Sequence, residues 1–92
     1  MKFTYPAIVR PREGGGYTVT FIDLADCRAS GDTLDEALDA AIAAELSWIT
    51  AELEEEDPQF PAASSRSSVS LADGEFIRDI GVIYHFQEGW SD

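Results

Sequence analysis

Two side chains of this sequence have the chemistry of a nucleophile and a general base, Cys27 and His85. A thiolate becomes a strong nucleophile when an imidazole takes its proton, and an imidazole can also ligate a metal ion. Both kinds of site need further partners, and neither residue lies in a recognisable local signature. The sequence therefore favours a strand histidine that faces solvent, and it predicts no catalytic residue.

Three consecutive glycines, Gly14 to Gly16, raise the question of a phosphate-binding loop. Such a loop opens a helix and is completed by Lys followed by Ser or Thr, and neither feature is present here. The glycines instead separate two segments with the alternation of strands, and glycine readily takes the positive φ that tight turns require. The pattern predicts the turn of a β-hairpin.

Eighteen Asp and Glu residues could supply the clustered carboxylates of a magnesium-dependent nuclease. However, the first apolar segment, residues 3–9, carries no acid, and the acids of the predicted helix lie mainly on one solvated face. Acids arranged in this way repel one another without converging on a cavity. The sequence predicts no metal site, no cofactor and no enzyme activity, and a metal-dependent nuclease stays as an alternative that no feature favours.

The balance of charged and apolar residues sets the class of protein. Six Lys and Arg against eighteen Asp and Glu give a net charge of −12, and 45% of the 92 residues are hydrophobic. The apolar share predicts a folded chain with one small core, so residues 1–92 are expected to form a single domain. The negative charge opposes binding to nucleic acid or to anionic lipid.

Cysteine content and apolar runs indicate the compartment. One cysteine cannot form an internal disulfide, and a secreted domain of this size usually needs several. No apolar run is long enough for a signal peptide or a membrane span. The expected location is therefore the cytoplasm, with no membrane association.

Two strands and a short third one are predicted in the first third of the chain. Apolar and polar residues alternate over residues 3–9 and again over 17–21, which is typical of half-buried strands. Pro6 lacks an N–H group and indicates an edge position for the first strand. A short extended piece near residues 27–30 could add a third strand.

A helix is predicted to begin at the capping box Thr33-Leu34-Asp35-Glu36, where the Thr33 hydroxyl and the Glu36 carboxylate each accept from an otherwise unpaired amide. Its apolar residues fall on one side at 100° per residue. The predicted inward-facing positions are Leu34, Ala37, Leu38, Ala41, Ile42, Trp48, Ile49 and Leu53. Acidic residues 54–57 oppose the helix dipole, which predicts fraying before Pro58.

The serine-rich residues 58–70 are predicted to form a surface loop, and a last strand follows it. The even-numbered positions of that strand share one face, which is apolar except for Arg78. The apolar residues on this face are Phe76, Ile80, Val82, Tyr84 and Phe86. The tail, residues 87–92, is expected to be loose. The order strand, strand, short strand, helix, strand predicts an α+β fold, in which an antiparallel or mixed sheet is covered on one face by one long helix.

The charge of the predicted helix is of one sign. Ten acids and no Lys or Arg lie between Asp32 and Asp57, so the helix has no opposite charges with which to form i,i+4 pairs. This pattern predicts a docking surface for a basic protein. The contact residues predicted from it are Asp35, Asp39, Glu45 and Glu52, because these side chains project from the helix without intrinsic partners.

Several segments together resemble a known family. They are Tyr5-Pro6-Ala7-Ile8, Gly15 to Phe21, Asp23-Leu24 with Cys27, the helix start Gly31 to Leu38, and the late Gly74-Glu75-Phe76. In this combination the chain resembles the N-terminal domain of HicB-family antitoxins over nearly its whole length. It departs from the family at Ile22 to Cys27, where prolines are common in the family and none occurs here.

The resemblance implies a partial ribonuclease H-like fold of β-β-β-α-β order without nuclease activity, which binds and masks a small basic ribonuclease toxin of the HicA type. It also implies a homo-oligomer, a dimer or tetramer. Family members usually continue into a DNA-binding domain, whereas no basic or helical segment follows the last predicted strand here, so no direct DNA binding is expected. A stand-alone oligomeric protein without a toxin partner stays open as an alternative.

Overall fold

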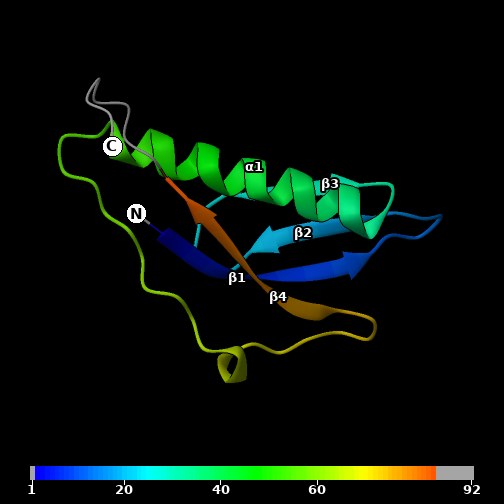
Figure 1. Ribbon diagram of the computed structural model, residues 1–92. Coiled ribbons are helices and arrows are strands. Elements are labelled where there is room, and N and C mark those ends of the chain that lie inside the picture. Colours follow the sequence, from blue (N-terminus) through cyan, green and yellow to red (C-terminus); the bar gives the residue numbers. More distant parts are fainter. Residues whose placement is uncertain (1, 85–92) are drawn as a thin grey trace.

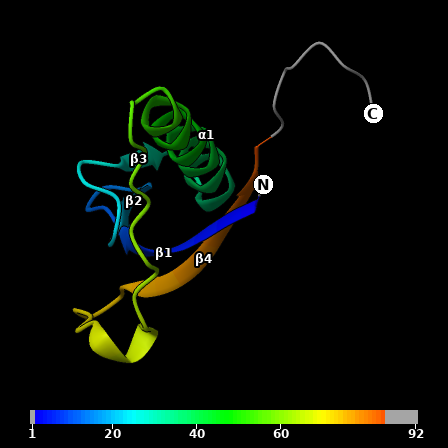
Figure 2. The same cartoon turned by 90° about the vertical axis from the view of Figure 1, so that its left-hand side faces the viewer.

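The computed structural model describes residues 2–84, and it forms one antiparallel sheet and one long helix (Figure 1). The elements in chain order are β1 (Lys2–Pro11), β2 (Tyr17–Phe21), β3 (Arg28–Gly31), α1 (Leu34–Leu53), the single-turn 3-10 helix η1 (Arg66–Ser68) and β4 (Phe76–Ile83). The strand order is β3-β2-β1-β4, and α1 covers one face of the sheet (Figure 2). The predicted α+β fold and its β-β-β-α-β order are confirmed, and the sheet is antiparallel.

The core lies between α1 and the sheet and follows the strand alternation. Tyr5, Ala7 and Val9 of β1 are buried there, and β2 contributes Val19 and Phe21. The helix faces them with small residues, Ala37 and Ala41, both fully buried. Gly31 allows the close approach at the start of α1, because a Cβ atom at this position would lie 2.5 Å from the Ala37 nitrogen.

The edge position predicted for β1 from Pro6 is wrong, because β1 pairs with both β2 and β4. The missing N–H costs little here for a geometric reason. Pro6 lies just beyond the paired end of β2, and its carbonyl still accepts a hydrogen bond of 3.3 Å from the Ile22 N–H. Proline is therefore tolerated in a central strand where the neighbouring strand ends.

The glycine triplet makes the turn between β1 and β2, as predicted. All three glycines have positive φ, between 86° and 114°, which other residues adopt only at an energetic cost. The Arg12 N–H closes the turn by donating to the Gly16 carbonyl at 2.8 Å. The hairpin therefore follows from local sequence.

Helix α1 begins at the predicted cap. The Glu36 N–H donates to Thr33 Oγ1 at 3.1 Å. The helix ends at Leu53, four residues before the acidic run finishes, and its last turn contains no basic residue that would stabilise the C-terminal end of the dipole. Among the predicted inward-facing residues, Ile42 is instead 42% exposed.

The segment that connects α1 to β4, residues 54–75, is called the strap here; it crosses from the helix to the opposite face of the sheet (Figures 1 and 2). The Tyr5 hydroxyl donates to the Pro61 carbonyl at 2.6 Å, and the Ser64 N–H donates to an Asp23 carboxylate oxygen at 2.8 Å. The predicted surface loop thus exists and contains η1, but it is tied to the sheet at several points.

The last strand pairs with β1 over its full length, from Lys2↔Ile83 to Val9↔Phe76. Ile80 and Val82 are buried in the predicted parity, and Arg78 is exposed. The expectations for His85, for Phe86 and for the tail, residues 87–92, lie outside the described residues.

Candidate protein-interaction surface

The acidic residues between Asp32 and Asp57 do not form one continuous surface. Most of them are exposed, but they gather at the two ends of α1, in residues 32–39 and residues 52–57. The one acid between these groups is Glu45, which is buried. Residues 39 and 52 are about 20 Å apart along the helix axis at the usual rise per residue.

Asp35 and Asp39 lie on the exposed side of the first helical turns, as predicted. They are four positions apart, so the two carboxylates are neighbours on the helix surface and repel each other. In the described part of the chain, neither makes an ion pair with a basic side chain. Asp32, just before the helix, lies 3.6 Å from an Arg12 guanidinium nitrogen, a contact between two well-exposed groups.

Glu52 differs from the prediction, because it has a partner within the chain. One of its carboxylate oxygens accepts a hydrogen bond of 2.8 Å from the Gln59 N–H. The side chain is half-buried at the point where the strap leaves the helix. Glu52 therefore helps to hold the strap, and its second oxygen is what it can offer to another molecule.

Glu45 is the larger correction, because its side chain is not on the surface at all. It is 0% exposed, and neither carboxylate oxygen has a hydrogen-bond partner among the described residues. Burial raises its pKa to about 7, because the apolar surroundings disfavour the charged form. A side chain enclosed in this way is removed from the predicted contact residues.

Two other titratable side chains lie in the same core. Burial raises the pKa of Tyr5 and of the Cys27 thiol, and the negative charge that Glu45 can acquire raises both further. The Cys27 thiol is buried and forms no disulfide with the described part of the chain. A raised pKa keeps it in the unreactive thiol form, which opposes a nucleophilic role.

Between its two acidic ends, the exposed side of α1 is neutral. Ile42 and Leu46 are 42% and 37% exposed, and a shallow hollow nearby is lined by Ala43, Leu46, Ser47, Thr50, Ala51 and Glu54. Along the outer surface of the helix, an apolar region therefore lies between two acidic ends. An apolar centre with a charged rim is the usual composition of a protein–protein interface.

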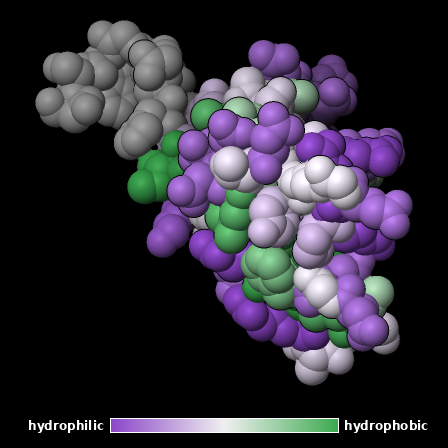
Figure 3. All heavy atoms as spheres, turned by 90° about the vertical axis from the view of Figure 1, so that its right-hand side faces the viewer, coloured by the Kyte–Doolittle hydropathy of each residue, from purple (hydrophilic) through white to green (hydrophobic). Residues whose placement is uncertain are grey.

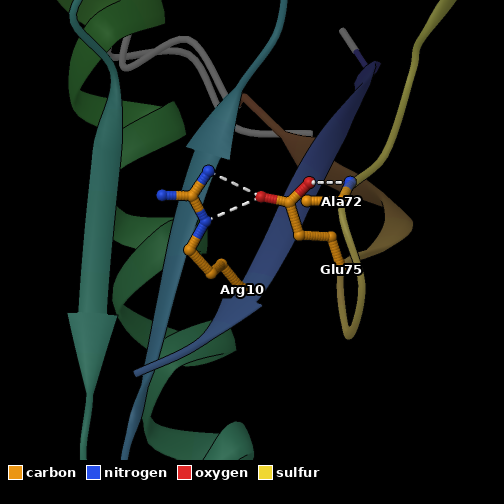
Figure 4. Close-up of polar contacts among 3 residues, drawn as sticks. All are labelled: Arg10, Ala72 and Glu75. Carbon is orange, nitrogen blue, oxygen red and sulfur yellow. Dashed lines mark hydrogen bonds and ion pairs between the residues drawn. The ribbon is translucent and has the colours of Figure 1, made fainter. Parts of the chain in front are cut away.

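Sequence reasoning missed the contacts that hold the strap and β4 in place. Arg10 and Glu75 form an ion pair of 2.6 Å, and the other Glu75 oxygen accepts from the Ala72 N–H at 2.7 Å (Figure 4). The hydrogen bond from Ala72, followed by the one from Arg10, lowers the pKa of Glu75. The partners are 65 positions apart, so no local pattern marks them.

Trp48 is a second contact that the helical pattern did not reveal. Its indole N–H donates to the Ala25 carbonyl at 3.1 Å and so ties the middle of α1 to the segment between β2 and β3. The ring is therefore held on the helix–sheet side instead of being offered to a partner.

Metal-binding clusters and membrane-spanning helices are both absent from the described part of the chain. In the described range, residues 2–84, no three His, Cys, Asp or Glu side chains lie close enough together to hold a metal ion. No helix within that range is long and apolar enough to cross a membrane.

Comparison with known proteins gives the family. A model of the HicB-like antitoxins of bacterial toxin–antitoxin systems matches residues 5–84. A solved structure described as a toxin–antitoxin complex from Streptococcus pneumoniae contains a chain that is 26% identical, with a TM-score of 0.68, over 100% of this chain and 79% of that one. No functionally curated protein matches significantly. The chain belongs to the family of HicB-like antitoxins of bacterial toxin–antitoxin systems.

Proposed function

We propose that this chain binds and occludes a small basic ribonuclease toxin of the HicA type. The observation that carries the proposal is the outer surface of α1, where exposed acids that have no basic partner among residues 2–84, such as Asp35 and Asp39, flank an apolar centre. The family and the similarity to a chain of a toxin–antitoxin complex support the same function. A ribonuclease that holds RNA on a basic face offers the complementary charge.

The proposed contact residues are Asp35 and Asp39 at the start of α1, together with the free oxygen of Glu52 and the exposed acids that follow it. Ile42 and Leu46 lie between these groups. Long-range attraction to the acids raises the association rate, and burial of the apolar centre provides most of the affinity. Charge and apolar contact therefore have separate roles on the same surface.

In this mechanism no bond is made or broken by the antitoxin. The toxin loses activity because the surface that binds RNA is covered, so the proposed protein is not an enzyme. Binding of operator DNA is assigned to another component, since a net charge of −12 repels phosphate. The free thiol of Cys27 suits the proposed cytoplasmic location.

The test is co-expression with a small basic protein encoded next to this gene. We expect that protein to arrest growth alone, and we expect this chain to restore growth and to co-purify with it. Failure to rescue a toxic neighbour would show that the antitoxin role is wrong. Self-association together with no binding to the neighbour would instead favour the stand-alone oligomer. Metal-dependent RNA cleavage by this chain that is lost when individual acidic residues are substituted would instead favour the alternative of a metal-dependent nuclease.

A further inference from the structure

A groove lies between the first half of α1 and β4. Leu38 and Ile42 are four positions apart, so they share one side of the helix, and Ile80 of the sheet core lies across from them. The groove has a volume of about 170 Å³ and is lined by Leu38, Ile42, Arg78, Asp79, Ile80 and Gly81. Its lining thus combines large aliphatic side chains with one guanidinium group. Figure 3 shows hydrophobic side chains exposed among hydrophilic ones on one side of the molecule.

The volume of the groove limits what it can hold. A cavity of about 150 Å³ lined by aliphatic and aromatic side chains accommodates a benzene ring. The groove is of similar size, so it has room for one large apolar side chain and not for a helix or a strand. Ile42 lines the groove and also belongs to the apolar centre of the outer α1 surface. A partner seated on that surface therefore lies beside the groove.

Arg78 is an exposed cation that has no ion pair with any residue from 2 to 84. Asp79 follows it directly, but successive side chains of a strand point to opposite faces, and the Asp79 carboxylate pairs with Arg66 at 3.1 Å. Asp35 and Asp39 of α1 make no ion pair with Arg78 either. The guanidinium group is thus available to another molecule, and its planar fork of N–H donors matches a carboxylate.

The positive charge of Arg78 is opposite to what attraction of a basic toxin requires. Residues 32–57 contain ten acids and no Lys or Arg, and Arg78 adds a cation beside this acidic helix. Long-range attraction to a basic protein would be stronger without it. A cation in this place is favourable when the partner contributes an acid in direct contact, because a close charge pair at an interface can stabilise a complex by more than screened long-range repulsion weakens it.

We propose that this groove selects the toxin: it holds one large apolar side chain of the toxin, and Arg78 pairs with an Asp or Glu next to that side chain. The inference rests on the proposed function and adds a specificity determinant to it. The acids at the ends of α1 attract any cationic protein, so they do not distinguish one basic protein from another. The groove does, because a basic protein without the matching acid leaves Arg78 unpaired in the interface.

The first experiment measures the binding kinetics of the small basic protein encoded next to this gene. Arg78→Glu makes this chain more negative, so net charge alone predicts tighter binding. We expect an equal or higher association rate but a dissociation rate about tenfold higher, because the close pair is lost. The control Arg28→Glu makes the same charge change at an exposed position of β3 and should leave the dissociation rate unchanged.

A second variant guards against a loss of folding. Arg78→Gln removes the charge without reversing it and should raise the dissociation rate in the same direction by a smaller factor. Circular dichroism checks that each variant is folded. An unchanged dissociation rate in both Arg78 variants would show that Arg78 has no partner in the complex.

The outcomes separate this inference from the proposed function. If the unchanged chain does not bind the basic protein, both are wrong. If it binds, and Arg78→Glu binds equally well or more tightly, only the role of the groove is wrong and the antitoxin function stands. If Arg78→Glu changes the mass of the free chain in sedimentation, a second copy covers the groove, which also contradicts the inference.

A charge exchange identifies the partner of Arg78. Each Asp and Glu of the basic protein is replaced in turn by Arg, and each product is tested against the unchanged chain and against Arg78→Glu. We expect one replacement to weaken binding to the unchanged chain and to restore binding to Arg78→Glu. If no replacement restores binding, the proposed pair between Arg78 and a toxin carboxylate does not exist.

Discussion

Both sides of α1 carry carboxylate side chains, but those on the outer side are exposed to solvent and the one on the inner side is buried. On the outer side, Asp35 and Asp39 are exposed and charged, and water screens their repulsion. On the inner side, Glu45 is enclosed, no residue between 2 and 84 offers it a hydrogen bond, and burial raises its pKa to about 7. The difference shows that only the carboxylates on the outer side of α1 are accessible to a partner.

The inner carboxylate is expected to give the largest measurable effect, on the pH dependence of folding. Glu45 binds its proton more tightly in the folded chain than in the unfolded one, where its pKa is near 4.5. The free energy of unfolding therefore falls as pH rises from about 4.5 to about 7, by about 3 kcal/mol from this group, and is constant above that range.

The variant Glu45→Gln removes the titrating group and should flatten this part of the profile. Urea unfolding at a series of pH values measures it. The matched control is Glu36→Gln, an exposed acid of the same helix, which should keep the slope of the unchanged protein. Identical slopes for all three proteins would mean that Glu45 ionises normally and that the contrast between the two sides does not exist.

The outer carboxylates are expected to act on the rate of toxin binding. Reversing two charges with Asp35→Lys and Asp39→Lys should slow association with a basic toxin about tenfold at low salt, and the difference should shrink as salt is added. Stopped-flow or surface-based kinetics measure both quantities. The control for each single variant is Asp73→Lys in the strap, which makes the same change in net charge at an exposed position outside the helix. An equal effect of the control would show that only net charge matters.

Removing the N-terminal cap of α1 is expected to have a smaller effect on the free energy of unfolding. Thr33→Ala removes the acceptor of the Glu36 N–H and should lower the free energy of unfolding by about 1 kcal/mol. Thr33→Ser retains the hydroxyl and should remain close to the unchanged protein. Chemical denaturation compares the three proteins, and a loss in the serine variant equal to that in the alanine variant would contradict the capping role.

The smallest expected effect concerns the other end of the helix. Glu54 is the C-cap residue of α1, where a negative charge opposes the helix dipole. Glu54→Lys should therefore raise the free energy of unfolding by about 0.5 kcal/mol at low salt. Glu54→Gln is the neutral comparison and should give an intermediate value. A destabilised lysine variant would show that the carboxylate has a structural role that the described contacts do not reveal.

Local signals in the sequence were sufficient for the elements and their order. The glycine triplet, the capping box and the alternation over residues 3–9 each act within a few positions, and the structure contains the turn, the cap and the strand that they predict. The likeness to ribonuclease H stays a prediction, as do the predicted oligomer and the identity of the toxin.

The sequence did not reveal how deeply each side chain is buried. It also did not reveal contacts between residues that are far apart along the chain. The one-signed charge of the helix made Glu45 a predicted contact residue, and no local pattern could show that its side chain is fully enclosed. Alternation in β1 identified a strand without identifying its neighbours, so Pro6 was assigned to an edge. The Arg10–Glu75 pair and the Asp23–Ser64 contact join residues 65 and 41 positions apart, and no spacing rule connects them.

The pairing of β1 with β4 has a consequence for how the chain folds. Its contacts span from 67 positions, for Val9 with Phe76, to 81 positions, for Lys2 with Ile83. Closing so long a loop costs more chain entropy than forming the β1–β2 hairpin or the first turns of α1. We therefore expect β4 to dock last, after a nucleus of hairpin and helix has formed. Until it does, β1 is the open edge of a three-stranded intermediate, so slow docking of β4 would leave the nascent protein exposed to aggregation.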